Sequence, residues 1–190
     1  RAATAELVAE RGPVGFSLRE VARRAGVSHA APAHHFGDSK GLLTAVAIEG
    51  LTILCDAFEE AIKGIEDPAD RLTALGKAYV KVATHHVGHF AVMWSDELID
   101  SCDHQFMEVA GRSYEYLVEA VSKIADERNP NLDIDAAATL AWSAVHGLAT
   151  LHCKPGSTDS CPANQNLELN TRIEQFTSLF LEGFVQRSAT

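Results

Sequence analysis

Apolar residues recur at three- and four-residue spacing along almost the whole 190-residue chain, and no stretch sustains the alternation of a half-buried strand. This spacing places apolar side chains on one face of an α-helix, and the 29 alanines add the residue with the highest helix propensity. Gly12-Pro13, Gly26 and Asn129-Pro130 are among the helix-stop and turn signals that divide the pattern. The sequence therefore predicts an all-α protein.

Between these signals the periodicity predicts helices over residues 2–11, 18–25, 29–36, 39–65, 68–86, 103–126, 133–152 and 167–187, with a short irregular segment over 90–94. Ser17, Ser28 and Asp67 are placed to cap the helices that follow them, because their side-chain oxygens can accept free backbone N–H groups. No apolar run approaches the roughly 20 residues of a membrane-spanning helix. The chain also starts without the apolar stretch of a secretory signal, so we expect a cytoplasmic protein with no membrane partner.

The two last predicted helices are apolar on more than one side. A helix on the surface of a monomer needs only one apolar stripe. We therefore expect the extra face to be buried against a second copy, as a four-helix homodimer interface; the alternative is a central helix pair in a monomeric core. The interface candidates are Ala141, Val145, Leu148, Ile173, Phe176, Phe180 and Phe184.

Residues 17–36 have the layout of a helix-turn-helix. An apolar stripe from Leu18 to Ala25 faces inward, and Gly26 supplies the left-handed conformation that ends the first helix. The second short helix then exposes small and hydrogen-bonding side chains that can enter a major groove. This segment predicts DNA binding.

The net charge of −10 is unevenly distributed and does not argue against that prediction. The first 50 residues carry 6 Lys+Arg against 5 Asp+Glu, whereas the remaining 140 carry 10 against 21. Phosphate binding requires local positive charge, not a positive average. The acidity belongs almost wholly to the second part of the chain.

The sequence Gly15-Phe-Ser-Leu-Arg-Glu-Val-Ala-Arg-Arg-Ala-Gly-Val-Ser28, followed by His34-His-Phe-Gly-Asp-Ser-Lys-Gly-Leu-Leu43, resembles the DNA-binding domain of the TetR (tetracycline-repressor) family. Trp142-Ser-Ala-Val-His146-Gly147 is similar to the Trp…His-Gly motif of one TetR subgroup. The resemblance implies a helix-turn-helix domain over 1–47 and a helical-bundle effector-binding and dimerisation domain over 48–190. It implies DNA contacts at Ser17, Arg19, Ser28, His29, Ala30, His34, His35 and Lys40.

The function implied by the resemblance is that of a homodimeric repressor that leaves double-stranded operator DNA when a small-molecule effector binds. The family often has Tyr where Ala33 and His35 stand, so we expect altered contacts there. A TetR-like fold would place the effector cavity at the polar and aromatic residues Tyr79, His86, Phe90, Met93, Trp94, Tyr114, Trp142 and His146, with no cofactor. The alternative for each of these residues is ordinary core packing.

Two other functions compete with effector sensing. His85 and His89 lie at i, i+4 with His86 between them, a spacing that Zn ligands use on a helix, so a metal-sensing regulator is one alternative. A helical ligand-binding protein with no role on DNA is the other. The chain has no Glu-x-x-His pair, nucleophile elbow or phosphate-binding glycine loop, so an enzyme is not expected.

Overall fold

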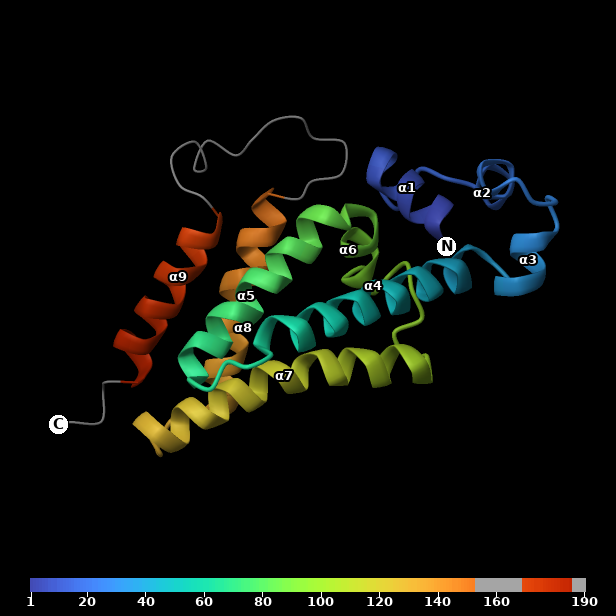
Figure 1. Ribbon diagram of the computed structural model, residues 1–190. Helices are drawn as coiled ribbons and strands as arrows, with labels where there is room; N and C mark the ends of the chain where they lie inside the picture. Colours follow the sequence, from blue (N-terminus) through green and yellow to red (C-terminus); the bar gives the residue numbers. More distant parts are fainter. Residues whose placement is uncertain (153–168, 186–190) are drawn as a thin grey trace. The chain divides into compact units, whose positions relative to one another are not determined.

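The computed structural model describes residues 1–152 and 169–185, and these residues form helices and no strand (Figure 1). The all-α prediction is confirmed. The helices are α1 Ala2–Arg11, α2 Leu18–Ala25, α3 Ala31–Phe36, α4 Ser39–Ile62, α5 Pro68–His85, α6 Val87–Met93, α7 His104–Arg128, α8 Ile134–His152 and α9 Leu169–Phe180, followed by the π-helical turn η2 Leu181–Val185.

Two of the predicted helix starts are confirmed in atomic detail. Ser17 has extended φ and ψ of −127° and 154°, and its Oγ accepts a hydrogen bond from Glu20 N at 3.3 Å. Asp67 Oδ1 accepts from Ala69 N at 2.8 Å and from Asp70 N at 3.0 Å, so it caps α5. These side chains satisfy backbone donors that have no partner inside the helix.

The predicted boundaries of the third helix and of the segment over 90–94 were wrong. The third helix begins at Ala31, its N-cap is Ala30 without a side-chain hydrogen bond, and Ser28 accepts from Ala31 N only through its carbonyl. Pro32 explains the late start, because proline lacks an N–H and is accommodated in the first turn of a helix. Residues 87–93 form the regular helix α6.

The chain divides into two compact units, each described by itself: residues 1–53 with 82–111, and residues 54–81 with 112–152 and 169–185. In the first unit, α1 packs against both α2 and α6, and α2 packs against α3. Its core around the helix-turn-helix consists of Leu7, Val21 and Leu42, against which Phe16, Leu18 and Phe36 pack.

The contact between α1 and α6 is a close approach of two backbones. A Cβ added to Gly88 on α6 would lie 1.9 Å from the carbonyl oxygen of Ala5 on α1. Gly50 on α4 is crowded in a similar way, since its Cβ would lie 2.7 Å from Sδ of Met93 on α6. Both contacts depend on the absence of a side chain at a helical position.

In the second unit, α8 contacts α9, and the buried residues come from the second half of α4 and from α5, α7, α8 and α9. Gly76 on α5 leaves room for Ile173 of α9, whose Cγ2 lies 2.8 Å from the position of an added Cβ. Arg128 at the end of α7 donates to Asp67 Oδ2 at 3.1 Å, next to the start of α5.

Helix α4 is long and apolar enough to cross a membrane by length and composition, contrary to the expectation that no run approaches that length. However, 56% of its apolar window is buried inside the protein, as is usual for the core helix of a folded domain. Its apolar character is therefore explained by packing.

Candidate functional site

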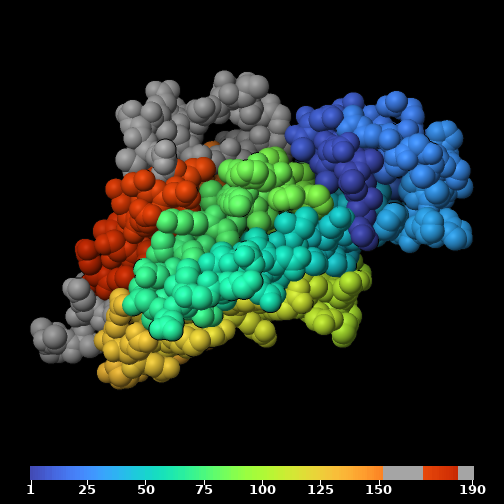
Figure 2. Space-filling view, viewed as in Figure 1, coloured from blue at the N-terminus to red at the C-terminus, as the bar shows by residue number. Residues whose placement is uncertain are grey.

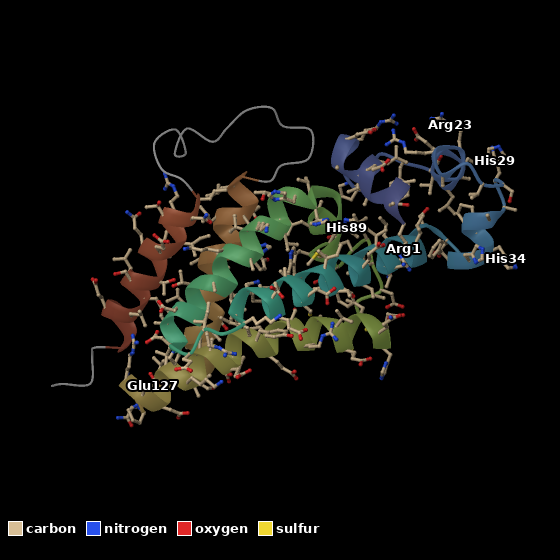
Figure 3. The ribbon with its side chains drawn as sticks, in the orientation of Figure 1. Arg1, Arg23, His29, His34, His89 and Glu127 are labelled. Carbon is tan, nitrogen blue, oxygen red and sulfur yellow. The ribbon has the colours of Figure 1, made fainter. Side chains whose placement is uncertain are left out.

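The residues expected to contact DNA all lie on exposed positions of the helix-turn-helix and the start of α4. We call this set the reading face: Ser17, Arg19, Ser28, His29, Ala30, His34, His35 and Lys40. Figure 3 shows the labelled Arg23 on α2, His29 in the turn and His34 on α3, and Figure 2 shows the face of these helices that is open in this view. The face is accessible to a large partner.

Buried neighbours hold the reading face in position. Val21 and Ala22 on α2 are buried, and Pro32 is the buried residue of α3. Gly26 adopts φ 67° and ψ 27°, and its N–H bonds to the carbonyl of Arg23, which ends α2 and turns the chain toward α3. Only glycine adopts this left-handed conformation without a steric cost.

The cations of this unit fall into two groups. Arg24 makes a two-pronged contact with Glu10 at 2.7 and 2.8 Å, and Arg11 donates to Glu20 at 2.8 Å. Hydrogen bonding from Arg24 lowers the pKa of Glu10. The second group is Arg19, Arg23 and Lys40, which form no ion pair within residues 1–152 and 169–185.

Histidines contribute much of the hydrogen-bonding capacity of the reading face. The rings of His34 and His35 lie edge to face with centroids 5.2 Å apart, and the ring of His35 lies 6.4 Å from that of Phe36. Phe36 packs on the core, so it anchors the end of α3 while the two histidines stay exposed. Imidazole nitrogens can contact both bases and phosphates.

Four of the eight effector candidates come together in the second unit. Tyr79 Oη and His146 Nδ1 are 2.7 Å apart, and the ring of Trp142 lies 6.2 Å from that of His146 and 6.1 Å from that of Tyr114. Tyr79 is buried and the other three are half-buried. Burial lowers the pKa of His146, which favours the neutral form of the ring. We call these four residues the sensor cluster.

The other four candidates belong to the first unit and lie on α6 or at its two ends. Phe90 and Met93 are buried, His86 is the N-cap of α6 and Trp94 is its C-cap. The contact of Met93 with Gly50 assigns Met93 to core packing.

The geometry expected for a metal site is not formed. Helix α5 ends at His85 and α6 begins at Val87, so His85 and His89 do not share one helix face. Burial lowers the pKa of His89, and its ring lies 5.8 Å from that of His86. Among the described residues, no group of three or more His, Cys, Asp or Glu side chains could hold a metal ion.

The dimer candidates face the interior of their own chain more than the sequence predicts. Leu148, Ile173 and Phe180 are buried within the chain, so they pack internally. Ala141, Val145 and Phe176 are half-buried, and the side chain of Phe184 lies outside the described residues. The large apolar side chains exposed on the described parts of α8 and α9 are Leu140, Leu151 and Leu179, and none of them was among the interface candidates. Periodicity locates two stripes on a helix but does not say which one faces the core.

Comparison with known families matches both parts of the chain. Residues 1–46 match the model of bacterial regulatory proteins of the tetR family, and residues 72–166 match the tetracyclin repressor-like C-terminal domain. The chain belongs to the TetR family. It is therefore a transcription regulator with a DNA-binding helix-turn-helix, as its sequence resemblance implied.

Several solved structures share the fold over nearly the whole chain. A protein of unknown function from Rhodococcus sp. RHA1 is 29% identical, with 97% of this chain and 93% of that chain covered and a TM-score of 0.78. The TetR family regulator PfmR from Thermus thermophilus is 19% identical, with 94% of each chain covered and a TM-score of 0.73. AibR, solved with isovaleryl coenzyme A and operator DNA, is 18% identical, with 95% and 93% covered and a TM-score of 0.65. No curated protein matches the sequence.

The TetR assignment gives the C-terminal Trp…His-Gly motif a structural context. Trp142 and His146 lie one helical turn apart on α8 and both belong to the sensor cluster. A Cβ added to Gly147 would meet nothing within 4 Å in the described chain, so packing inside the chain does not require glycine there.

Proposed function

We propose that this TetR-family protein is a repressor that binds operator DNA as a homodimer and is released by a small-molecule effector. The observation that supports it most is the exposed reading face, where Arg19 and Lys40 form no ion pair within the described residues. We assign DNA binding to residues 1–47 and effector binding and dimerisation to residues 48–190. A non-enzymatic protein of the cytoplasm fits this role, and TetR-family regulators are generally non-enzymatic.

We assign two kinds of DNA contact to the reading face. Arg19 and Lys40 contact phosphates, which position the protein but carry no sequence information. Ala30 contacts a base edge, because its methyl group fits the thymine methyl, and the imidazole of His34 can contact either a base edge or a phosphate. Two α3 helices would then read successive major grooves of a pseudo-palindrome.

The homodimer would use the outer face of α8 and α9. Leu140, Ala144, Gly147 and Leu151 follow one another at helical spacing on α8, with the two leucines 40% and 55% exposed. Small residues at the centre of the face allow two helices to approach closely, and leucines on both sides supply apolar area. Leu179, 64% exposed, adds to this face from α9.

Light scattering of one variant on this face and one away from it tests the interface. Leu140→Asp should give a folded monomer, because a carboxylate would be buried against a second copy. The matched control Lys63→Ala changes an exposed side chain elsewhere and should stay dimeric. A persistent Leu140→Asp dimer would move the interface to another face.

The sensor cluster is the proposed effector contact in the second unit. Its aromatic rings offer apolar area, and Tyr79 and His146 add hydrogen-bonding groups, a combination typical of small-molecule sites. An effector releases DNA only if it has different affinities for the DNA-binding and the released arrangement. The fold similarity to AibR, which was solved with isovaleryl coenzyme A and operator DNA, is consistent with a regulator that takes both kinds of partner.

Selection of a duplex from a random-sequence library tests DNA binding. The protein should enrich one pseudo-palindromic sequence, and Lys40→Ala should weaken its binding and reduce the salt slope by about 1 for each phosphate that is no longer neutralised. Lys63→Ala is again the control, since that lysine lies in the second unit and should leave the affinity unchanged. Failure to enrich any sequence, or affinity independent of salt, would refute the proposed function.

A further inference from the structure

The reading face has few permanent cations and several histidines. Within the first unit, Arg11 and Arg24 are held by carboxylates of the chain, and Arg1 donates to Glu49 at 2.7 Å. The arginines and lysine without an ion pair in the described residues are Arg19, Arg23 and Lys40. His29, His34 and His35 are exposed on the same surface, as Figure 3 shows for the labelled His29 and His34.

The charged groups around these histidines are mostly positive or already paired. Glu20 on α2 is held by Arg11, and Asp38 Oδ1 accepts a hydrogen bond from Gly41 N at 2.8 Å. None of the three histidines forms an ion pair with a carboxylate in the part of the chain that the structure describes. The charged residues on the neighbouring elements are Arg1, Glu6, Glu10 and Arg11 on α1 and its N-cap, Arg19, Glu20, Arg23 and Arg24 on α2, Asp38 in the loop before α4, and Lys40 and Glu49 in the first half of α4.

The rings of His34 and His35 are 5.2 Å apart, so any charge that they carry is concentrated on one small part of the reading face. Arg19, Arg23 and Lys40 add positive charge on the same surface. Histidine is the side chain whose charge ordinarily changes between about pH 5 and 8.

The phosphates of DNA favour the charged form of a nearby imidazole. We propose that operator binding is coupled to proton uptake by His29, His34 and His35, so that DNA affinity rises as pH falls from 8 to 6. The proposal rests on the proposed DNA-binding function and adds its regulation by protons. The histidines would supply phosphate-binding charge that permanent cations supply elsewhere.

The coupling has two measurable consequences. A phosphate contact that stabilises the charged form of one imidazole tenfold over its neutral form changes the dissociation constant of the DNA complex by roughly sixfold between pH 6 and 8. The factors of several histidines multiply. Imidazolium groups that neutralise phosphates also displace counterions, so the salt slope should be steeper at pH 6 than at pH 8 by about 1 or more.

The experiment uses the full chain and the duplex that it enriches from a random library. Fluorescence anisotropy at pH 6, 7 and 8, each at two salt concentrations, gives affinity and salt slope. The wild type should bind at least tenfold more tightly at pH 6 than at pH 8. A variant with His29→Gln, His34→Gln and His35→Gln should lose most of this difference. His104→Gln, at an exposed position at the start of α7, should keep it.

The outcomes separate this proposal from the proposed function. Affinity that does not change with pH, or a pH dependence that persists in the triple variant, would overturn proton coupling and leave DNA binding intact. Failure of the wild type to bind or enrich any duplex at all three pH values would overturn the proposed function and this proposal with it. Circular dichroism at pH 6 confirms that the compared proteins are folded, and single His→Gln variants replace the triple variant if it does not fold.

Discussion

Replacing Gly88 by alanine tests the contact between α1 and α6 directly. The added methyl carbon would lie 1.9 Å from the carbonyl oxygen, 2.7 Å from the carbonyl carbon and 3.1 Å from Cα of Ala5. Favourable contacts lie near 3.5–4.0 Å, so the two helices would have to separate by roughly 1 Å or more. The atoms in the way belong to backbone, and no side-chain rotation can relieve the overlap.

The magnitude follows from two opposing effects. Alanine improves helix propensity by about 1 kcal/mol, whereas overpacking costs about 1–3 kcal/mol, and a backbone obstacle places this case at the upper end. The expected net loss is about 2 kcal/mol, which corresponds to a Tm lower by about 4–8 °C in a chain of this size. Because α1 also packs against α2, the displaced α1 should weaken DNA binding as well.

Thermal and urea unfolding measure this effect, with Gly111→Ala as the control. A Cβ at Gly111, inside α7, would meet nothing within 4 Å, so alanine there should stabilise the protein by about 1 kcal/mol. A Gly88→Ala variant as stable as the wild type would refute the close approach of α1 and α6.

Three further predictions concern two half-buried histidines, one hydrogen bond and one ion pair. Burial lowers the pKa values of His89 and His146, so the unfolded chain takes up protons at a higher pH than the folded protein does, and stability should fall as pH drops below about 6.5. Urea unfolding at pH 7.5 and 5.5 measures this loss, and stability that does not change with pH would contradict it. Tyr79→Phe removes the 2.7 Å hydrogen bond to His146 and should cost about 1 kcal/mol by the same assay; an unchanged unfolding midpoint would argue against that bond. Arg24→Ala should lower the Tm slightly, and Arg24→Lys should not restore it, because an ammonium cannot bind both oxygens of Glu10 as a guanidinium does. A Tm of Arg24→Lys equal to that of the wild type in differential scanning fluorimetry would contradict the two-pronged contact.

Local signals in the sequence were sufficient to locate several helix ends. Ser17, Gly26 and Asp67 each act within four residues of chain, so their residue types identify helix ends without tertiary information. The start of α3 was misjudged because serine is a preferred N-cap residue, which favoured Ser28. The observed N-cap is Ala30, which places Pro32 in the first turn of the helix.

Relations between distant residues could not be derived in the same way. Tyr79 and His146 are 67 positions apart, and no spacing rule pairs them. The apparent i, i+4 relation of His85 and His89 failed because the helix breaks between them. Leu140 and Leu148 are both apolar residues of α8, and only tertiary packing shows that the first is exposed and the second buried.

The short helix α3 separates the residues that fix the fold from those that face outward. Pro32 and Phe36 hold the helix, whereas Ala30, Ala33 and His34 are exposed, and the N-cap makes no side-chain hydrogen bond that a substitution could remove. Exposed positions without such bonds usually tolerate exchange within about 0.5 kcal/mol of stability. Under the DNA contacts proposed for this helix, evolution or an engineer with a randomised library can alter which DNA sequence is recognised while the scaffold stays unchanged.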